Sequence, residues 1–138
     1  MKKDWSKEWK SSSQPRKQRK YRAKAPLHVK HKLVSSHLSK ELRKEYGVRS
    51  IPVRKGDSVK IMIGSFKNFT GRVTKVSLAR EFAHVEGAAV TRSDGTKSLY
   101  PLNPSNLLIT KLDTSDKKRV QKLEKLKTEA KKSQGGKE

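Results

Sequence analysis

Cysteine is absent from the 138 residues, which excludes disulfide bonds, thiolate metal sites and cysteine nucleophiles. Long apolar runs are missing as well, whereas a membrane-spanning helix needs about 20 apolar residues. The first residues are charged and polar, without the apolar segment of a secretory signal. These absences predict a soluble protein of a reducing compartment, with no membrane span and with the cytosol as its default location.

The sequence also lacks a recognisable catalytic or metal-binding pattern. No glycine-rich loop ends in Gly-Lys-Ser or Gly-Lys-Thr, and no serine lies in a nucleophile elbow. His28 and His31 lie three residues apart, but no carboxylate or cysteine completes a metal site at a known spacing. We therefore expect a protein that is not an enzyme and that uses no metal and no cofactor.

Acidic residues are scarce relative to basic ones. Lysine and arginine number 35 against 13 aspartates and glutamates, which makes the net charge +22. Only 31% of residues are hydrophobic and 35% are charged, whereas a globular domain is roughly 45–50% apolar and about 25% charged. The chain is therefore not expected to form one compact body throughout, and a polyanionic partner is its first predicted ligand.

The charge is unevenly distributed and divides the chain into three segments. The net charge is +12 over residues 1–50, +6 over residues 51–112 and +4 over residues 113–138. The first segment has few apolar residues and is predicted to be a basic N-terminal arm with short helices. The second holds most of the branched aliphatic residues and is the candidate core. The third is predicted to form a C-terminal helix and a frayed tail.

Short strands separated by glycine turns are predicted in the middle segment. Val59, Ile61 and Ile63 alternate with other residues, a period of two that indicates a strand with one buried face. Val73 and Val76 are three apart, which requires a bulge in the next strand. Further strands are predicted over residues 82–86, 88–92, 96–100 and 107–112, with a hairpin turn at Asp94-Gly95. This pattern favours a mainly β fold, a small barrel whose closure removes exposed edges.

Helices are predicted over residues 27–34, 38–46 and 113–132. Pro26 suits the first position of the first helix. Ser36 is a candidate N-cap and Gly47 a candidate C-cap of the second helix. Ser115 or Asp116 would cap the third, whose apolar stripe is thin.

The sharpest feature is a basic run over residues 16–24, in which six of nine residues are cationic and one is Tyr21. Lysine and arginine neutralise phosphates and release condensed counterions, and arginine and tyrosine also stack on bases. A tail that only solubilises or targets the protein would share this composition. The excess charge continues to residue 55, which favours contact with RNA or DNA.

A motif with known relatives begins the middle segment. Residues 55–64, Lys67 and residues 71–76 resemble a KOW motif, the strand–loop–strand unit of SH3-like barrels in ribosomal proteins and transcription elongation factors. The motif alone leaves both families open. The flanking residues are closely similar to the universal large-subunit ribosomal protein twenty-four, numbered twenty-six in eukaryotic naming, over residues 25–30, 35–43, 46–57 and 104–112. The resemblance covers roughly residues 14–130 and is to the archaeal-like branch.

One position departs from the family pattern. The family often has glycine after the loop lysine, where this chain has Asn68. Asparagine tolerates a left-handed backbone better than most residues, so we expect the turn to be kept. Trp5 and Trp9 lie outside the resemblance.

The resemblance implies a structural constituent of the large ribosomal subunit, in the cytoplasm. Such a protein binds large-subunit ribosomal RNA directly near its 5′ region, nucleates assembly early and lies near the peptide exit tunnel. Its implied partners are neighbouring ribosomal proteins and nascent chains or targeting factors at the exit, with the protein itself a monomer within the ribosome. A hairpin after the motif points toward the exit in the family, and its tip would here comprise Arg92, Ser93, Asp94 and Gly95.

The residues expected to contact RNA are mostly cations that would hold phosphates, with Tyr21 and Phe66 as candidates for stacking on bases. They are Arg16, Lys17, Arg19, Lys20, Tyr21, Arg22, Lys24, His28, Lys30, Lys32, Ser36, Lys40, Arg43, Arg49, Arg54, Lys55, Phe66, Lys67, Asn68 and Arg72.

Two other functions are alternatives. A transcription elongation module would use the same barrel to contact polymerase, but it normally carries a second α/β domain. A general nucleic-acid chaperone or chromatin-like protein would share the charge but not the flanking motifs.

Overall fold

A computed structural model describes residues 5–6, 8 and 12–134 of the chain, with side chains to residue 130. Trp9 lies outside the described residues. The fold is mainly sheet, with helices before the first strand, between the first two strands and after the last strand. Its elements are α1 (Pro15–Lys24), α2 (Leu27–Leu33), β1 (Ser35–Leu38), α3 (Lys40–Tyr46), β2 (Ser50–Pro52), β3 (Ser58–Ile61), β4 (Thr70–Ser77), β5 (Phe82–Val85), β6 (Ala89–Thr91), β7 (Lys97–Leu99), the 3-10 turn η1 (Pro104–Asn106), β8 (Leu107–Lys111) and α4 (Lys117–Gln134).

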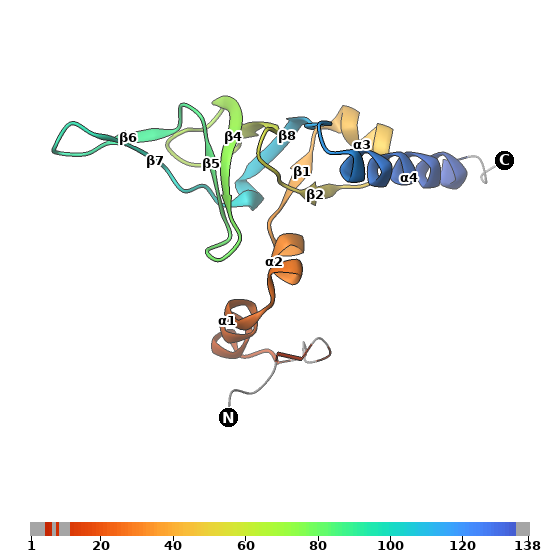
Figure 1. The fold of residues 1–138 in the computed structure, drawn as a ribbon, viewed down its shortest axis with the longest axis horizontal. Helices are drawn as coiled ribbons and strands as arrows, with labels where there is room; N and C mark the ends of the chain where they lie inside the picture. Colours follow the sequence, from red (N-terminus) through yellow and green to blue (C-terminus); the bar gives the residue numbers. More distant parts are fainter. Residues whose placement is uncertain (1–4, 7, 9–11, 135–138) are drawn as a thin grey trace.

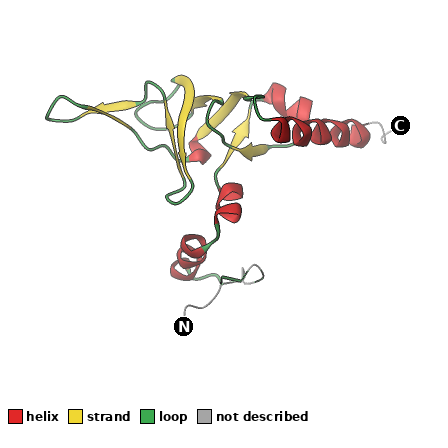
Figure 2. Ribbon diagram, viewed as in Figure 1, coloured by secondary structure: helices red, strands yellow, loops and turns green. Residues whose placement is uncertain are grey.

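Six strands form one sheet in the order β2-β1-β8-β3-β4-β5, and β6 and β7 form a separate hairpin. The pairs are antiparallel except β1 with β8, which is parallel. The expected closed barrel is not found, because the sheet stays open at β2 and β5 (Figure 2). β5 instead exchanges hydrogen bonds of 2.9 and 2.8 Å between Ala83 and Leu102, and beyond β2 the amide of Val53 donates to Val34.

Alternating side chains of the central strands build the core. In β3, Val59 and Ile61 are fully buried while Ser58 and Lys60 are only half-buried, which confirms the period of two. The expected extension to Ile63 is wrong, since that side chain is 62% exposed. The strand ends at Ile61, where hydrogen bonds to Asn68 and Phe69 close a loop over residues 62–68.

The predicted bulge and hairpin are both present. The β4–β5 register shifts between Val73 and Lys75, which lets Val73 be buried and Val76 half-buried. The β6–β7 hairpin closes with Arg92 donating its amide to Thr96, and it projects from one end of the molecule (Figure 1). Helix α4 extends toward the opposite end, while α1 and α2 lead away from the sheet.

The helix expected over residues 38–46 begins later than predicted. Residues Ser35–Leu38 form strand β1, and Ser39 caps α3 by accepting a hydrogen bond from the amide of Leu42. Gly47 ends α3 with a φ of 66°, as predicted. Leu38 and Ser36 are both fully buried because β1 lies between β2 and β8 in the sheet.

The C-terminal helix packs on α3. Asp116 caps α4 through its carboxylate, which accepts from the amide of Lys118 at 2.9 Å. Farther along, Lys127 forms an ion pair with Glu45 and lies 5.3 Å from the ring centroid of Tyr46. The hydrogen bond to Glu45 raises the pKa of Lys127. These contacts attach α4 to α3.

Candidate nucleic-acid interface

The basic run forms α1, a helix of ten residues without a buried side chain. Pro15 stands in its first turn, where a missing amide hydrogen is tolerated. Six predicted contact residues lie exposed on this helix: Arg16, Lys17, Arg19, Lys20, Arg22 and Lys24. The six cations of this helix are therefore all accessible to a ligand, whereas Gln18 and Tyr21 are half-buried.

Contacts with Trp5 and Glu81 connect α1 to other parts of the described chain. The ring of Trp5 lies 5.0 Å from that of Tyr21, and its Nε1 donates to the main-chain oxygen of Tyr21 at 3.1 Å. Arg22 forms an ion pair with Glu81 in the turn between β4 and β5. Tyr21 is therefore half-covered by an indole, a pairing for which the sequence carried no signal.

The remaining predicted contact residues differ in exposure. His28, Lys32, Lys40, Arg49, Lys55, Lys67, Asn68 and Arg72 are exposed. Lys30 is only 8% exposed at the root of the arm. Ser36 is fully buried and donates its hydroxyl to the main-chain oxygen of Pro104 at 2.6 Å, so its role here is to join β1 to η1.

Like Arg22, two further arginines of the predicted set already have partners within the protein. Arg43 donates from Nε to the main-chain oxygen of Leu38 at 2.8 Å, and lies 3.3 Å from Nδ1 of His37. Arg54 forms an ion pair with Asp116, and this hydrogen bond is the first cause of the lowered pKa of Asp116. Both side chains are half-buried.

The loop between β3 and β4 presents a mixed surface. Asn68 has a φ of 68°, which confirms the expected left-handed turn beside Lys67. Phe66 packs against the core, with its ring 5.6 Å from that of Tyr100. Gly71 leaves no room for a ligand, because a Cβ there would lie 2.6 Å from the main-chain oxygen of Glu86.

The tip of the β6–β7 hairpin is far from α1 along the molecule (Figure 1). Residues 92–95 are all exposed. Asp94 accepts hydrogen bonds from the hydroxyl and amide of Thr96 at 2.7 and 3.0 Å, which lower its pKa. The structure therefore does not bring the tip together with the arm.

A buried ion pair joins Asp57 to Arg119, and the sequence did not predict it. Asp57 is fully buried and accepts two hydrogen bonds from Arg119, at 2.5 and 2.8 Å. Its carboxylate also accepts from the amides of Arg54 and Asp113, both at 2.9 Å. This carboxylate joins the start of β3 to the first turn of α4, 62 residues away, and to the segment that precedes α4.

A small groove of about 230 Å³ opens beside this pair, between α4 and the β2 region. Apolar side chains line it together with His31 and four cations: Arg54, Lys118, Arg119 and Lys122. Burial lowers the pKa of His31, and the charges of Arg54, Lys122 and Arg119 lower it further. Lys118 and Lys122 were not predicted as site residues, because the sequence of α4 indicated only a helix with a thin apolar stripe.

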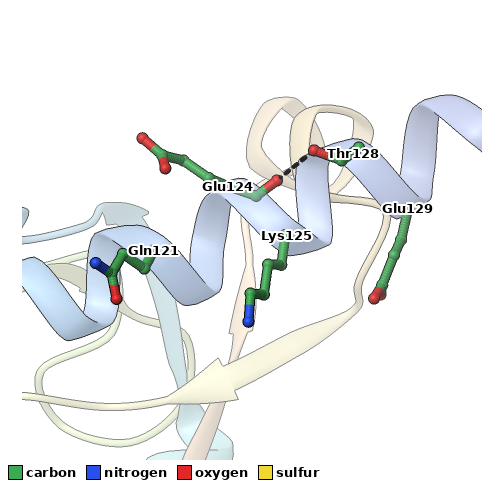
Figure 3. Close-up of a pocket in the computed structure, with 5 residues that line it drawn as sticks. All are labelled: Gln121, Glu124, Lys125, Thr128 and Glu129. Carbon is green, nitrogen blue, oxygen red and sulfur yellow. Dashed lines mark hydrogen bonds between the residues drawn. The ribbon is translucent and has the colours of Figure 1, made fainter.

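A second hollow, of about 430 Å³, lies along α4 (Figure 3). All five of its lining residues come from this one helix, among them Glu124 and Glu129. Its mixed charge does not favour a polyanion.

A cleft of about 440 Å³ lies between α1 and the turn after β4. It brings the predicted contacts Arg19 and Arg22 together with Arg80, Asn103 and Ser105, which sequence analysis did not single out. These three come from loops that are separate in the sequence from the basic run.

Neither metal nor membrane chemistry is indicated in the described part of the chain. It places no group of three or more metal-ligating side chains together. None of its helices is long and apolar enough to cross a membrane.

An antiparallel-rich sheet that carries a cationic helical arm defines a class of small, basic, RNA-binding proteins. The model of one family, described as the ribosomal proteins L26 of eukaryotes and their archaeal L24 counterparts, matches residues 12–126. The chain belongs to this family. It is therefore a protein of the large ribosomal subunit that acts in translation as part of a ribonucleoprotein. The matched range runs from just before α1 into α4 and includes every predicted contact residue.

Proposed function

We propose that this protein binds large-subunit ribosomal RNA directly and without catalysis, as a structural constituent in the cytoplasm. The observation that carries this proposal is α1, which exposes six cations and buries no residue. A helix of this kind gains little from packing on its own protein, and most of its free energy of ordering has to come from a partner of opposite charge.

The contact surface comprises α1, the exposed cations of α2 and the loop between β3 and β4. Lys67, Asn68 and Arg72 present exposed side chains at this loop. We take β3, the loop and β4 as the KOW unit of an SH3-like fold whose sheet is open. Phosphate contacts set the position of the protein, and the shape of the folded RNA supplies specificity.

The finer role follows from the family resemblance and is part of the proposal. The protein joins the subunit early, near the 5′ region of the RNA, and lies near the peptide exit tunnel. The projecting β6–β7 hairpin, with Arg92 to Gly95 at its tip, supports a role for this end of the molecule at the exit. Its partners there are neighbouring ribosomal proteins and nascent chains or targeting factors, with one copy per subunit.

A charge-neutralising triple variant tests the RNA-binding surface. Changing Arg16, Lys17 and Lys20 to glutamine is expected to weaken binding to a transcript of the large-subunit RNA. Each lost phosphate contact removes about 0.7–0.9 from the slope of log affinity against log salt, so three remove about 2–3.

The matched control removes the same charge from exposed lysines outside the predicted surface, at positions 75, 97 and 125. It is expected to change the slope by less than one contact's share, about 0.7. Equal slopes for the two triple variants would contradict the assignment of α1 as the contact surface. Retention of the wild type on large subunits after a high-salt wash checks the ribosomal location separately.

A further inference from the structure

We propose that the cleft between α1 and the β4–β5 turn clamps one segment of RNA backbone, and that Glu81 holds Arg22 in place until a phosphate replaces it. This inference rests on the proposed function, because it names how one part of the RNA-binding surface grips its ligand. The clamp joins the cationic arm to the sheet through the ligand itself.

The charged residues of the cleft come from two separate parts of the chain. Arg19 and Arg22 come from α1, while Arg80 and Glu81 come from the turn after β4. Its volume of about 440 Å³ lies within the range of about 300–1,000 Å³ typical of ligand sites. Such a cleft is large enough for a sugar-phosphate unit and open enough for a chain to pass through.

The charges in the cleft favour an anion. Three arginines face one glutamate, so an excess of two positive charges remains. No hydrogen bond or ion pair to the side chains of Arg19 and Arg80 is found within the described residues. Guanidinium groups bind phosphate with paired, charge-assisted hydrogen bonds, which suits a backbone ligand better than a neutral one.

The carboxylate of Glu81 binds Arg22 where a phosphate of the RNA would bind it. Its ion pair with Arg22 leaves the two side chains 20% and 53% exposed, respectively. Ion pairs with this much exposure stabilise a protein by only about 0.2–1 kcal/mol. A phosphate can therefore replace the carboxylate at little cost, and Arg22 is already turned toward the cleft when the RNA arrives.

The turn conformation places both charged residues on the cleft. Glu81 has a φ of 59°, in the left-handed region that residues other than glycine adopt infrequently. In an extended strand, neighbouring side chains would point to opposite faces. The left-handed residue breaks this alternation, and Arg80 and Glu81 line the same cleft.

Neutral side chains line the rest of the cleft. The side-chain oxygen of Asn103 accepts from the amide of Ser105 at 3.1 Å, which caps η1. This leaves the amide hydrogens of Asn103 and the hydroxyl of Ser105 available for a phosphate or a ribose 2′-hydroxyl. The half-buried Phe82 and buried Pro104 supply apolar surface for the sugar.

Two glutamates allow a matched test. Glu81→Gln and Glu124→Gln change the net charge equally. Glu124 is exposed on α4, outside the proposed RNA-contact surface. Affinity of the full-length variants is measured for a transcript of the 5′ third of the large-subunit RNA and for an unrelated folded RNA of equal length.

Glu81→Gln is expected to bind the ribosomal transcript about two- to fivefold more tightly, because the competitor for Arg22 is lost. Glu124→Gln is expected to change affinity less than twofold. Arg80→Gln is expected to weaken binding and to lower the salt slope by about 0.7–0.9. Its control, Lys111→Gln, removes an exposed cation outside the predicted surface and is expected to keep the slope.

Equal behaviour within each pair of variants would overturn the clamp while leaving ribosomal RNA binding intact. Weaker binding of Glu81→Gln would also overturn it, since Glu81 would then contribute to the RNA-bound state and would not be replaced by a phosphate. Equal affinity of the wild type for both RNAs would instead contradict the proposed function. The variant pairs still decide the clamp in that case, because each is measured on both RNAs.

Discussion

Replacing Arg119 by methionine is expected to lower the free energy of unfolding by about 3–5 kcal/mol. The side chain of Arg119 is 6% exposed and that of Asp57 is fully buried. Methionine keeps most of the volume but removes both donors, at 2.5 and 2.8 Å from the carboxylate oxygens. The carboxylate would then retain only the amides of Arg54 and Asp113 as partners.

The magnitude follows from the burial of the charge that is left behind. A hydrogen bond to a charged group contributes about 1.5–3 kcal/mol, and two are lost here. Asp57→Asn is expected to cost a similar amount, because an amide has one acceptor oxygen, whereas this carboxylate accepts hydrogen bonds on both of its oxygens. In the double variant the two losses are expected to overlap by more than about 2 kcal/mol, as for residues in direct contact.

Urea denaturation, followed by far-ultraviolet circular dichroism, measures these losses. Arg54→Met is the control, since it removes another arginine–aspartate pair that links the β2–β3 region to the start of α4. That pair is 39% and 43% exposed and is expected to contribute at most about 1 kcal/mol. If Arg119→Met is too unstable to fold, Arg119→Lys keeps the charge and should give an intermediate loss. A loss of less than about 1 kcal/mol for Arg119→Met would refute the reasoning.

Three further predictions concern stability. Gly71→Ala is expected to cost about 1–3 kcal/mol by overpacking, since its Cβ would lie 2.6 Å from a main-chain oxygen that cannot move freely; an unchanged urea midpoint would show that β4 and β5 separate easily. Ile109→Ala, at a fully buried position in central strand β8, is expected to cost about 2–5 kcal/mol in the same assay. The pKa of His31 is lower in the folded chain, so as the pH falls the unfolded chain takes up a proton at this position before the folded chain does. The folding stability that depends on neutral His31 is therefore fully present above about pH 6.5 and is lost as the pH falls below that value. His31→Gln should therefore lose less stability than the wild type between pH 7.5 and 5, and parallel curves for the two proteins would contradict this.

Features encoded by neighbouring residues could be predicted from the sequence. The alternation of Val59 and Ile61, the Asp94-Gly95 turn and the left-handed Asn68 depend on local backbone preferences and on a period of two. The cationic character of the arm depends on composition alone. These features are present in the structure because no distant contact opposes them.

Strand β1 shows where local reading was insufficient. Residues 35–38 lie at the start of a helical pattern, and the helix was predicted to begin at Leu38. In the fold, the segment pairs with β2 on one side and with β8, about 70 residues later in the chain, on the other. Hydrogen-bonded pairing at both edges of the segment outweighs the weak helical preference of two serines and a histidine.

Sequence alone determined the charge of this protein, its mainly β core, its hairpin and the position of its basic arm, because these follow from composition and from short-range periodicity. The tertiary structure decided that the sheet is open, that Ser36 is internal, that Asp57 pairs with Arg119 and that Arg22 meets Glu81. Each of the two ion pairs joins residues about 60 positions apart. Contacts at that separation depend on how strands and helices pack in space, and no local pattern of residues specifies them.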